Sequence, residues 1–106
     1  MDYPMVLKIL VVAPTMKEAQ EVLDLISIHE KNVQRRTSYT LVGDNYIYYA
    51  LPLDTCSKAG RVDQLIVVNK EEVLASEKFT QVVLPLVHSL KRLPKEFYEY
   101  RVQYWS

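Results

Sequence analysis

Glycine is scarce in this chain of 106 residues, since only Gly43 and Gly60 occur. This scarcity excludes a GxxxxGK[ST] phosphate loop, a GxGxxG turn and a solenoid that needs repeated glycine turns. The single cysteine, Cys56, excludes an internal disulfide and indicates a reducing compartment. No apolar run approaches the ~20 residues of a membrane span. These absences predict a cytoplasmic protein that does not bind membranes.

An excess of either charge is also missing, because 13 basic residues balance 13 acidic ones. A chain without net charge has no global field that attracts nucleic acid, so such binding would need a local basic patch. What the chain does contain is a hydrophobic share of 49%, which is too high for a disordered protein. The length suits one folded unit, and we expect residues 1–106 to form a single domain.

The first half of the chain predicts a strand, a helix and a hairpin. Residues 5–13 form a nearly continuous run of Val, Ile and Leu, which is typical of a strand buried on both faces. Thr15 with Glu18 three residues later is a capping box, so a helix is expected to begin there. Two β-rich runs, 35–41 and 45–51, flank a Gly-Asp-Asn turn and predict an antiparallel hairpin.

The second half predicts another strand, a helix and a last strand. Residues 62–69 form a short buried strand, and Asn69 is expected to cap the helix after it. Apolar residues keep helical spacing over 79–90, where Pro85 predicts a kink or two abutting helices. Residues 97–105 alternate between apolar and polar side chains, which indicates a half-buried strand at a sheet edge.

The predicted order is therefore strand, helix, hairpin, strand, helix, strand. Strands separated by helices favour a sheet with parallel members and right-handed crossovers. The sequence predicts an α/β fold: a single small domain of two or three layers, with a mixed sheet of about five strands, a β-hairpin and a C-terminal edge strand.

Two stretches of the chain resemble parts of a known family. Residues 9–15 read ILVVAPT and are followed by Lys17-Glu18-Ala19, and Ala50-Leu51-Pro52 precedes GRVDQLIVVN at residues 60–69. The first stretch resembles the strand and loop after the nucleotide loop of helicases and viral DNA-packaging terminases. The second resembles the approach to their second nucleotide motif. A rival alignment to the second helicase lobe covers residues 8–31 and 47–69, and both alignments imply a RecA-like α/β core.

The chain departs from this family where ATP hydrolysis depends on it. The family's phosphate loop would stand before Met5, and Asn69-Lys70 replaces the acidic pair that ends the second motif. Magnesium would lose its anchoring carboxylate. The arginine-finger motif of the second lobe is absent as well. The resemblance therefore implies the fold without a working ATPase in this chain alone, and we expect no cofactor.

Three loops are candidates for a ligand site, because ligands of open α/β sheets bind beyond the carboxyl ends of the strands. These loops are Pro14–Lys17, Asp54–Arg61 and Asn69–Glu72. Thr15 and Lys17 at a helix start, together with Asn69, are the residues expected to hold a phosphate group. The favoured alternative is that Thr15 only caps the helix and Lys17 is solvated, since Glu18 in the same turn repels an anion.

Cys56 is the one candidate nucleophile. Lys58 and Arg61 follow it in the same loop, and their charges would lower the pKa of its thiol. A catalytic cysteine also needs a histidine base, and neither His29 nor His88 is expected at this loop. The spacing of cysteine, histidine and carboxylate residues matches no metal motif. We therefore expect no catalytic residue and no metal site.

Aromatic residues concentrate in the predicted last strand. Tyr98, Tyr100 and Tyr104 fall on one face, which is typical of core packing. Phe97 and Trp105 lie off that face and are the leading interface candidates, with Tyr100 beside them. Basic residues that a nucleic-acid surface would use are Arg35, Arg36, Lys58, Arg61, Lys91, Arg92, Lys95 and Arg101.

Three functions follow from these observations. The favoured one is a non-catalytic binding or regulatory protein whose aromatic edge strand engages another protein or a second copy. Its compact, glycine-poor and tyrosine-rich composition resembles that of accessory proteins of viruses and mobile elements. The second is a nucleic-acid-binding module related to helicase or terminase lobes. The third is an enzyme that uses the Cys56 loop.

Overall fold

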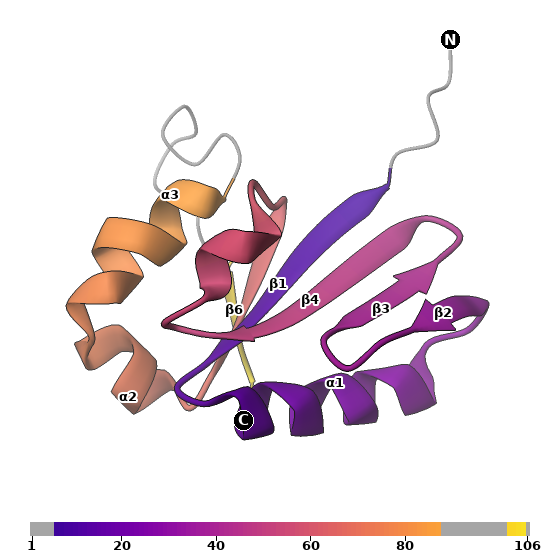
Figure 1. Ribbon diagram of the computed structural model, residues 1–106, viewed down its shortest axis with the longest axis horizontal. Coiled ribbons are helices and arrows are strands. Elements are labelled where there is room, and N and C mark those ends of the chain that lie inside the picture. Colours follow the sequence, from indigo (N-terminus) through magenta and orange to yellow (C-terminus); the bar gives the residue numbers. More distant parts are fainter. Residues whose placement is uncertain (1–5, 88–101, 106) are drawn as a thin grey trace, which may run out of the picture.

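The computed structural model describes residues 6–87 and 102–105 (Figure 1). Within them lie six strands: β1 (Leu7–Ala13), β2 (Val33–Arg36), β3 (Thr40–Gly43), β4 (Tyr46–Pro52), β5 (Gln64–Val68) and β6 (Val102–Trp105). The helical segments are α1 (Met16–His29), the 3₁₀ turn η1 (Cys56–Ala59), α2 (Lys70–Ala75), the π-helical turn η2 (Phe79–Val83) and α3 (Leu84–Leu86).

All six strands belong to one mixed sheet of order β2-β3-β4-β1-β5-β6. β1 lies in the middle and pairs in parallel with β4 and β5, and β5 pairs in parallel with β6. β3 pairs antiparallel with both β4 and β2. The prediction of an α/β domain with a mixed sheet and a C-terminal edge strand is confirmed, and the sheet has six strands where about five were expected.

Helices cover both faces of the sheet, so the domain has three layers (Figure 1). Successive residues of β1 point to opposite faces: Leu10 and Val12 belong to one core cluster, Val11 and Ala13 to the other. The buried residues of α1 that pack on the second cluster are Ala19, Val22, Leu23 and Ile26. The first cluster lies under η1, α2 and η2. This double burial explains why the sequence of β1 is apolar without alternation.

The sixth strand arises because the run 35–41 does not form one strand. A turn interrupts it, in which the Thr37 N–H donates to the Thr40 carbonyl at 2.9 Å. The Thr40 N–H in turn donates to the hydroxyl of Thr37 at 3.1 Å. Short threonine side chains compete well for backbone groups in such turns. The predicted hairpin is therefore a three-stranded antiparallel unit.

Two local predictions concern Pro85 in the second helical region and Asn69 at the start of α2. Pro85 lies in the first turn of α3, which directly follows the π-helical turn η2, so the prediction of two abutting helices is confirmed. Asn69 does not cap α2 with its side chain. Its backbone adopts the left-handed region, at a φ of 57°, and the chain turns there from β5 into the helix. Asn69 is therefore the N-cap residue of α2, as predicted, but its carbonyl and not its side chain accepts the N–H groups of Glu72 and Val73.

Candidate functional site

The edge strand β6 lacks the features that usually prevent pairing with another chain, and it carries two aromatic side chains. β6 is the last strand in the sheet order, and no strand among the described residues pairs with its outer side. Its sequence, Val-Gln-Tyr-Trp, carries neither a charge nor a proline. Natural edge strands are usually protected by charges, prolines or bulges. As far as the described residues extend, β6 therefore presents backbone groups that another strand can pair with.

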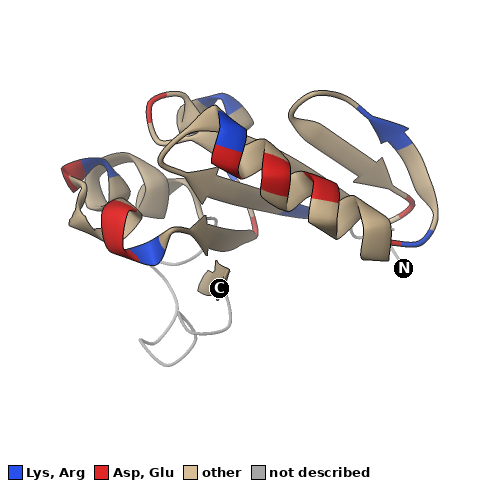
Figure 2. Cartoon of the chain, turned by 90° about the horizontal axis from the view of Figure 1, so that it is seen from below, with Lys and Arg blue, Asp and Glu red and all other residues tan. Residues whose placement is uncertain are grey.

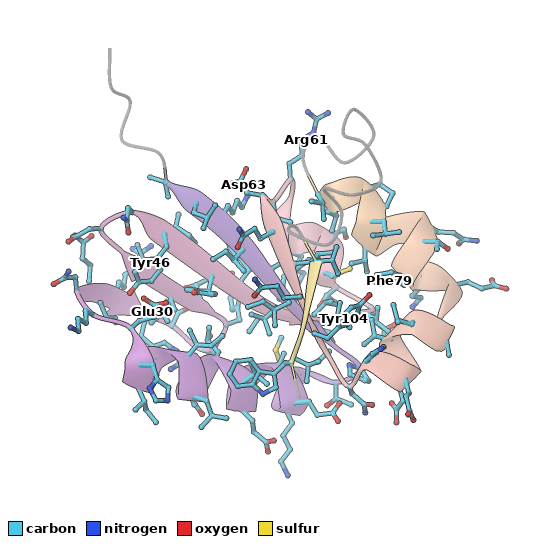
Figure 3. The ribbon with its side chains drawn as sticks, turned by 180° about the vertical axis from the view of Figure 1, so that it is seen from behind. Glu30, Tyr46, Arg61, Asp63, Phe79 and Tyr104 are labelled. Atoms are coloured by element: carbon cyan, nitrogen blue, oxygen red, sulfur yellow. The ribbon has the colours of Figure 1, made fainter. Side chains whose placement is uncertain are left out.

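Tyr104 lies on the same face of the sheet as α2 and is 49% exposed. The ammonium group of Lys70, the first residue of α2, lies 4.9 Å from the centre of its ring. This cation–π contact orients the phenol beside the edge of the sheet (Figure 3). The sequence pattern placed Tyr104 on the same face as Val102, which packs on the core, but the Tyr104 ring stays half exposed there beside Lys70 instead of being packed into the core.

Trp105 lies on the opposite face, where it is partly buried. It packs against the core cluster under α1, together with Ile66 of the neighbouring strand. Val102, at the other end of β6, packs against the cluster on the α2 side. A strand added to β6 would thus be flanked by Tyr104 on one face and by Trp105 on the other.

The opposite edge of the sheet is built differently. All four residues of β2 are exposed, and its pairing with β3 is interrupted by a register shift between Val33 and Arg35. Arg36 forms an ion pair with Asp24 of α1 at 2.6 Å, which ties the strand to the helix. A bulge and two arginines are devices that discourage pairing with another chain. Within residues 6–87 and 102–105, the protected edge is therefore β2 and the open edge is β6.

The carboxyl ends of the parallel strands bring only part of the predicted ligand site together. Thr15 caps α1, accepting the Glu18 N–H at 3.2 Å, and the side-chain amide of Asn69 donates to the Glu18 carboxylate at 3.4 Å. The space between Thr15 and Asn69 thus holds an acidic side chain. Lys17 is exposed beside it. This arrangement disfavours a phosphate ligand and agrees with the alternative in which Thr15 is only a cap.

The third predicted loop starts at this edge and then leaves it. The chain from Asp54 to Arg61 crosses from the end of β4 to the start of β5, and Asp63 exchanges two hydrogen bonds with the backbone of Lys8, at 2.9 and 2.7 Å. Figure 3 shows Arg61 and Asp63 together at the edge where β5 begins. Only the start of the Asp54–Arg61 loop therefore lies beside the other two loops, because β5 runs parallel to β4 and the rest of the connection must return across the sheet.

Cys56 lies in the core and not on a reactive surface. Its side chain is fully buried in the cluster that also contains Leu51 and Val83, and its thiol donates to the Leu53 carbonyl at 3.4 Å. Burial raises the pKa of the thiol above its ordinary value. The expectation of a lowered pKa is therefore wrong, and the charge of Lys58 does not reverse it because Lys58 points to solvent.

The basic residues in the described part of the chain do not gather into one patch (Figure 2). Arg35 and Arg36 lie on β2, whereas Lys58 and Arg61 lie in or after η1. Acidic residues recur along α1, between these regions (Figure 2). The remaining predicted binding residues, which are Phe97, Tyr100, Lys91 and Arg92 with Lys95 and Arg101, lie outside the described residues.

Comparison with known proteins adds no identification. No family model, no curated protein and no solved structure matches the chain. The resemblance to terminase and helicase cores therefore stays a prediction. Over residues 6–87 and 102–105, no group of three or more histidine, cysteine, aspartate or glutamate residues could hold a metal ion. No helix in that same part of the chain has the length and apolar character needed to cross a bilayer.

Proposed function

We propose that this chain is a non-catalytic binding protein that captures a protein partner by strand addition at β6. The observation that carries the proposal is the difference between the two edges of the sheet. β2 has a bulge and charges, whereas β6 has an uncharged edge with aromatic residues on both faces. Strand addition gains affinity from backbone hydrogen bonds and specificity from alternate side chains.

Each part of β6 has a separate role in this proposal. The outer backbone groups pair with the incoming strand, Tyr104 contacts its side chains on the α2 face, and Trp105 contacts those on the α1 face. Tyrosine and tryptophan contribute disproportionately to binding energy, because they bury a large area with few rotatable bonds.

Three contacts argue against the nucleic-acid alternative for the described residues. Arg36 is paired with Asp24, and Lys78 is paired with Asp54. Lys8 lies over the ring of Tyr49, at 5.1 Å from its centre. Cations engaged in this way are less available to phosphates than free ones, and the acidic residues of α1 repel a polyanion.

Affinity capture with a matched pair of edge variants tests the proposal. The tagged chain is incubated with lysate of its host after nuclease treatment, and retained proteins are identified by mass spectrometry. Gln103→Lys adds a charge to the exposed face of β6, and Gln34→Lys makes the same change on β2. We expect a stoichiometric partner that Gln103→Lys loses, by about tenfold or more in recovery, and that Gln34→Lys retains.

Two results would contradict the proposal. Equal recovery by wild type and Gln103→Lys would show that β6 is not the binding edge. Partners that disappear after nuclease treatment would support the nucleic-acid alternative instead.

A further inference from the structure

The β6 edge can pair with a second copy of itself. This requires more than unpaired backbone groups, because the side chains of the edge must also tolerate their own counterparts. In a symmetric pair each residue of the edge faces its own counterpart or a near neighbour, so a charged edge repels itself. β6 carries no charge, whereas β2 would bring Arg35 and Arg36 against their equals. The chain as a whole has a net charge of zero, so long-range repulsion between copies is absent.

The alternation of β6 limits the registers that such a pair can adopt. Val102 and Tyr104 point to the α2 face, and Gln103 and Trp105 to the α1 face. A two-fold axis perpendicular to the sheet makes the two edge strands antiparallel and keeps each face continuous across the pair. Residues on the same face must then lie opposite each other. A register centred on Gln103 satisfies this condition.

That register pairs the exposed aromatic ring with a half-buried apolar side chain. Tyr104 of one copy lies opposite Val102 of the other, and the same contact occurs twice by symmetry. Pairs of an aromatic and a β-branched residue are among the favourable cross-strand combinations. Tyr104 remains 49% exposed beside the Lys70 ammonium, so part of its side chain is available for this contact.

We infer that the partner of β6 is a second copy of this chain, and that two β6 strands pair antiparallel about Gln103 to form a continuous twelve-stranded sheet. The inference rests on the proposed function, because it names the occupant of the same edge. A four-residue edge offers few backbone hydrogen bonds, so the dimer dissociates on dilution.

Charge-swapped variants of Gln103 test both the partner and the register. Gln103→Lys alone and Gln103→Glu alone place like charges opposite each other across the axis, whereas an equimolar mixture places opposite charges there. Sedimentation velocity of the full chain over a concentration series measures the association. We expect wild type to dimerise. The dissociation constant of the dimer should rise about tenfold or more for each variant alone, and the mixture should recover the wild-type value. Gln34→Lys is the control and should dimerise like wild type.

The outcomes separate this inference from the proposed function. A wild-type chain that stays monomeric up to about 100 μM, ten times a typical weak-complex Kd, overturns the second copy. If it still captures a protein that Gln103→Lys loses, the proposed function stands with a different partner. A dimer that both single variants leave intact overturns the pairing at β6. A mixture that stays monomeric while wild type dimerises overturns the register centred on Gln103.

Discussion

At the scale of single residues, the turn from β3 into β4 requires the absence of a side chain at Gly43. Gly43 ends β3, and a Cβ atom at this position would overlap the ring of Tyr46. That ring is buried, its hydroxyl donates to the Lys31 carbonyl at 3.3 Å, and it packs edge-on against Tyr48 at 5.4 Å between centres. The tight turn into β4 therefore depends on the absence of a side chain.

We expect Gly43→Ala to lower the free energy of unfolding by about 1–3 kcal/mol, the usual cost of overpacking a well-packed site. Urea denaturation measures the change. The Tyr46→Ala background is the control, because removal of the ring removes the clash and the second substitution should then cost much less. Equal costs in both backgrounds would show that the Tyr46 ring is not the cause.

Residue-scale predictions from the sequence succeeded where the cause is local. The Thr15 cap depends on the backbone N–H three residues ahead, and in the structure the Glu18 N–H donates to the Thr15 hydroxyl oxygen. The burial of Cys56 and the exposure of Tyr104 could not be predicted in this way, because their environments come from distant segments. Residues of η1 and η2 enclose the thiol, and the phenol stays half exposed beside Lys70 of α2. Periodicity indicates a face of an element and not what covers that face.

At the scale of elements, the sequence indicated the major strands and helices of the described residues. It missed one boundary, the division of the run 35–41 between β2 and β3. Near-continuous apolar runs predicted β1 and β5 because both strands are buried on two faces. The split between β2 and β3 was missed because it depends on the hydrogen bonds of the Thr37–Thr40 turn. Threonine also has a high strand propensity, so composition alone favours one continuous strand there.

The two edge strands illustrate why an element's role depends on its neighbours. β2 is short, bulged and held to α1 by Arg36 and by Gln20, whose side chain donates to the Ser38 carbonyl at 3.0 Å. β6 is equally short, and its sequence alone indicated that it lies at an edge. What the sequence could not show is that the other edge is protected, which makes β6 the edge available for pairing.

At the scale of the whole molecule, the burial of weakly acidic groups makes the free energy of unfolding fall as the pH rises in the alkaline range. Burial raises the pKa of Tyr48 above its ordinary value of 10.0, and its hydrogen bond to Glu30, at 2.9 Å, adds to the effect. Burial likewise raises the pKa of Tyr46 above 10.0 and that of Cys56 above 9.0. The unfolded chain therefore loses these protons at a lower pH than the folded chain does.

We expect the free energy of unfolding to be unaffected by these groups below pH 9 and to fall as the pH rises further, because the folded state then binds more protons. Each titrating group contributes a slope of up to about 1.4 kcal/mol per pH unit. Urea denaturation between neutral pH and pH 11 measures it. Tyr48→Phe should flatten the decline above pH 10.0. A wild-type stability that stays constant over the whole range would contradict this account.

The central claim is that the chain associates through β6 and not through β2. Amide hydrogen exchange, compared between the dissociated and the associated chain, tests it most directly because it reports pairing at each edge separately. We predict that the amides of Val102–Trp105 exchange more slowly in the associated form, while those of Val33–Arg36 are unchanged. Slower exchange at Val33–Arg36, with no change at Val102–Trp105, would contradict the claim.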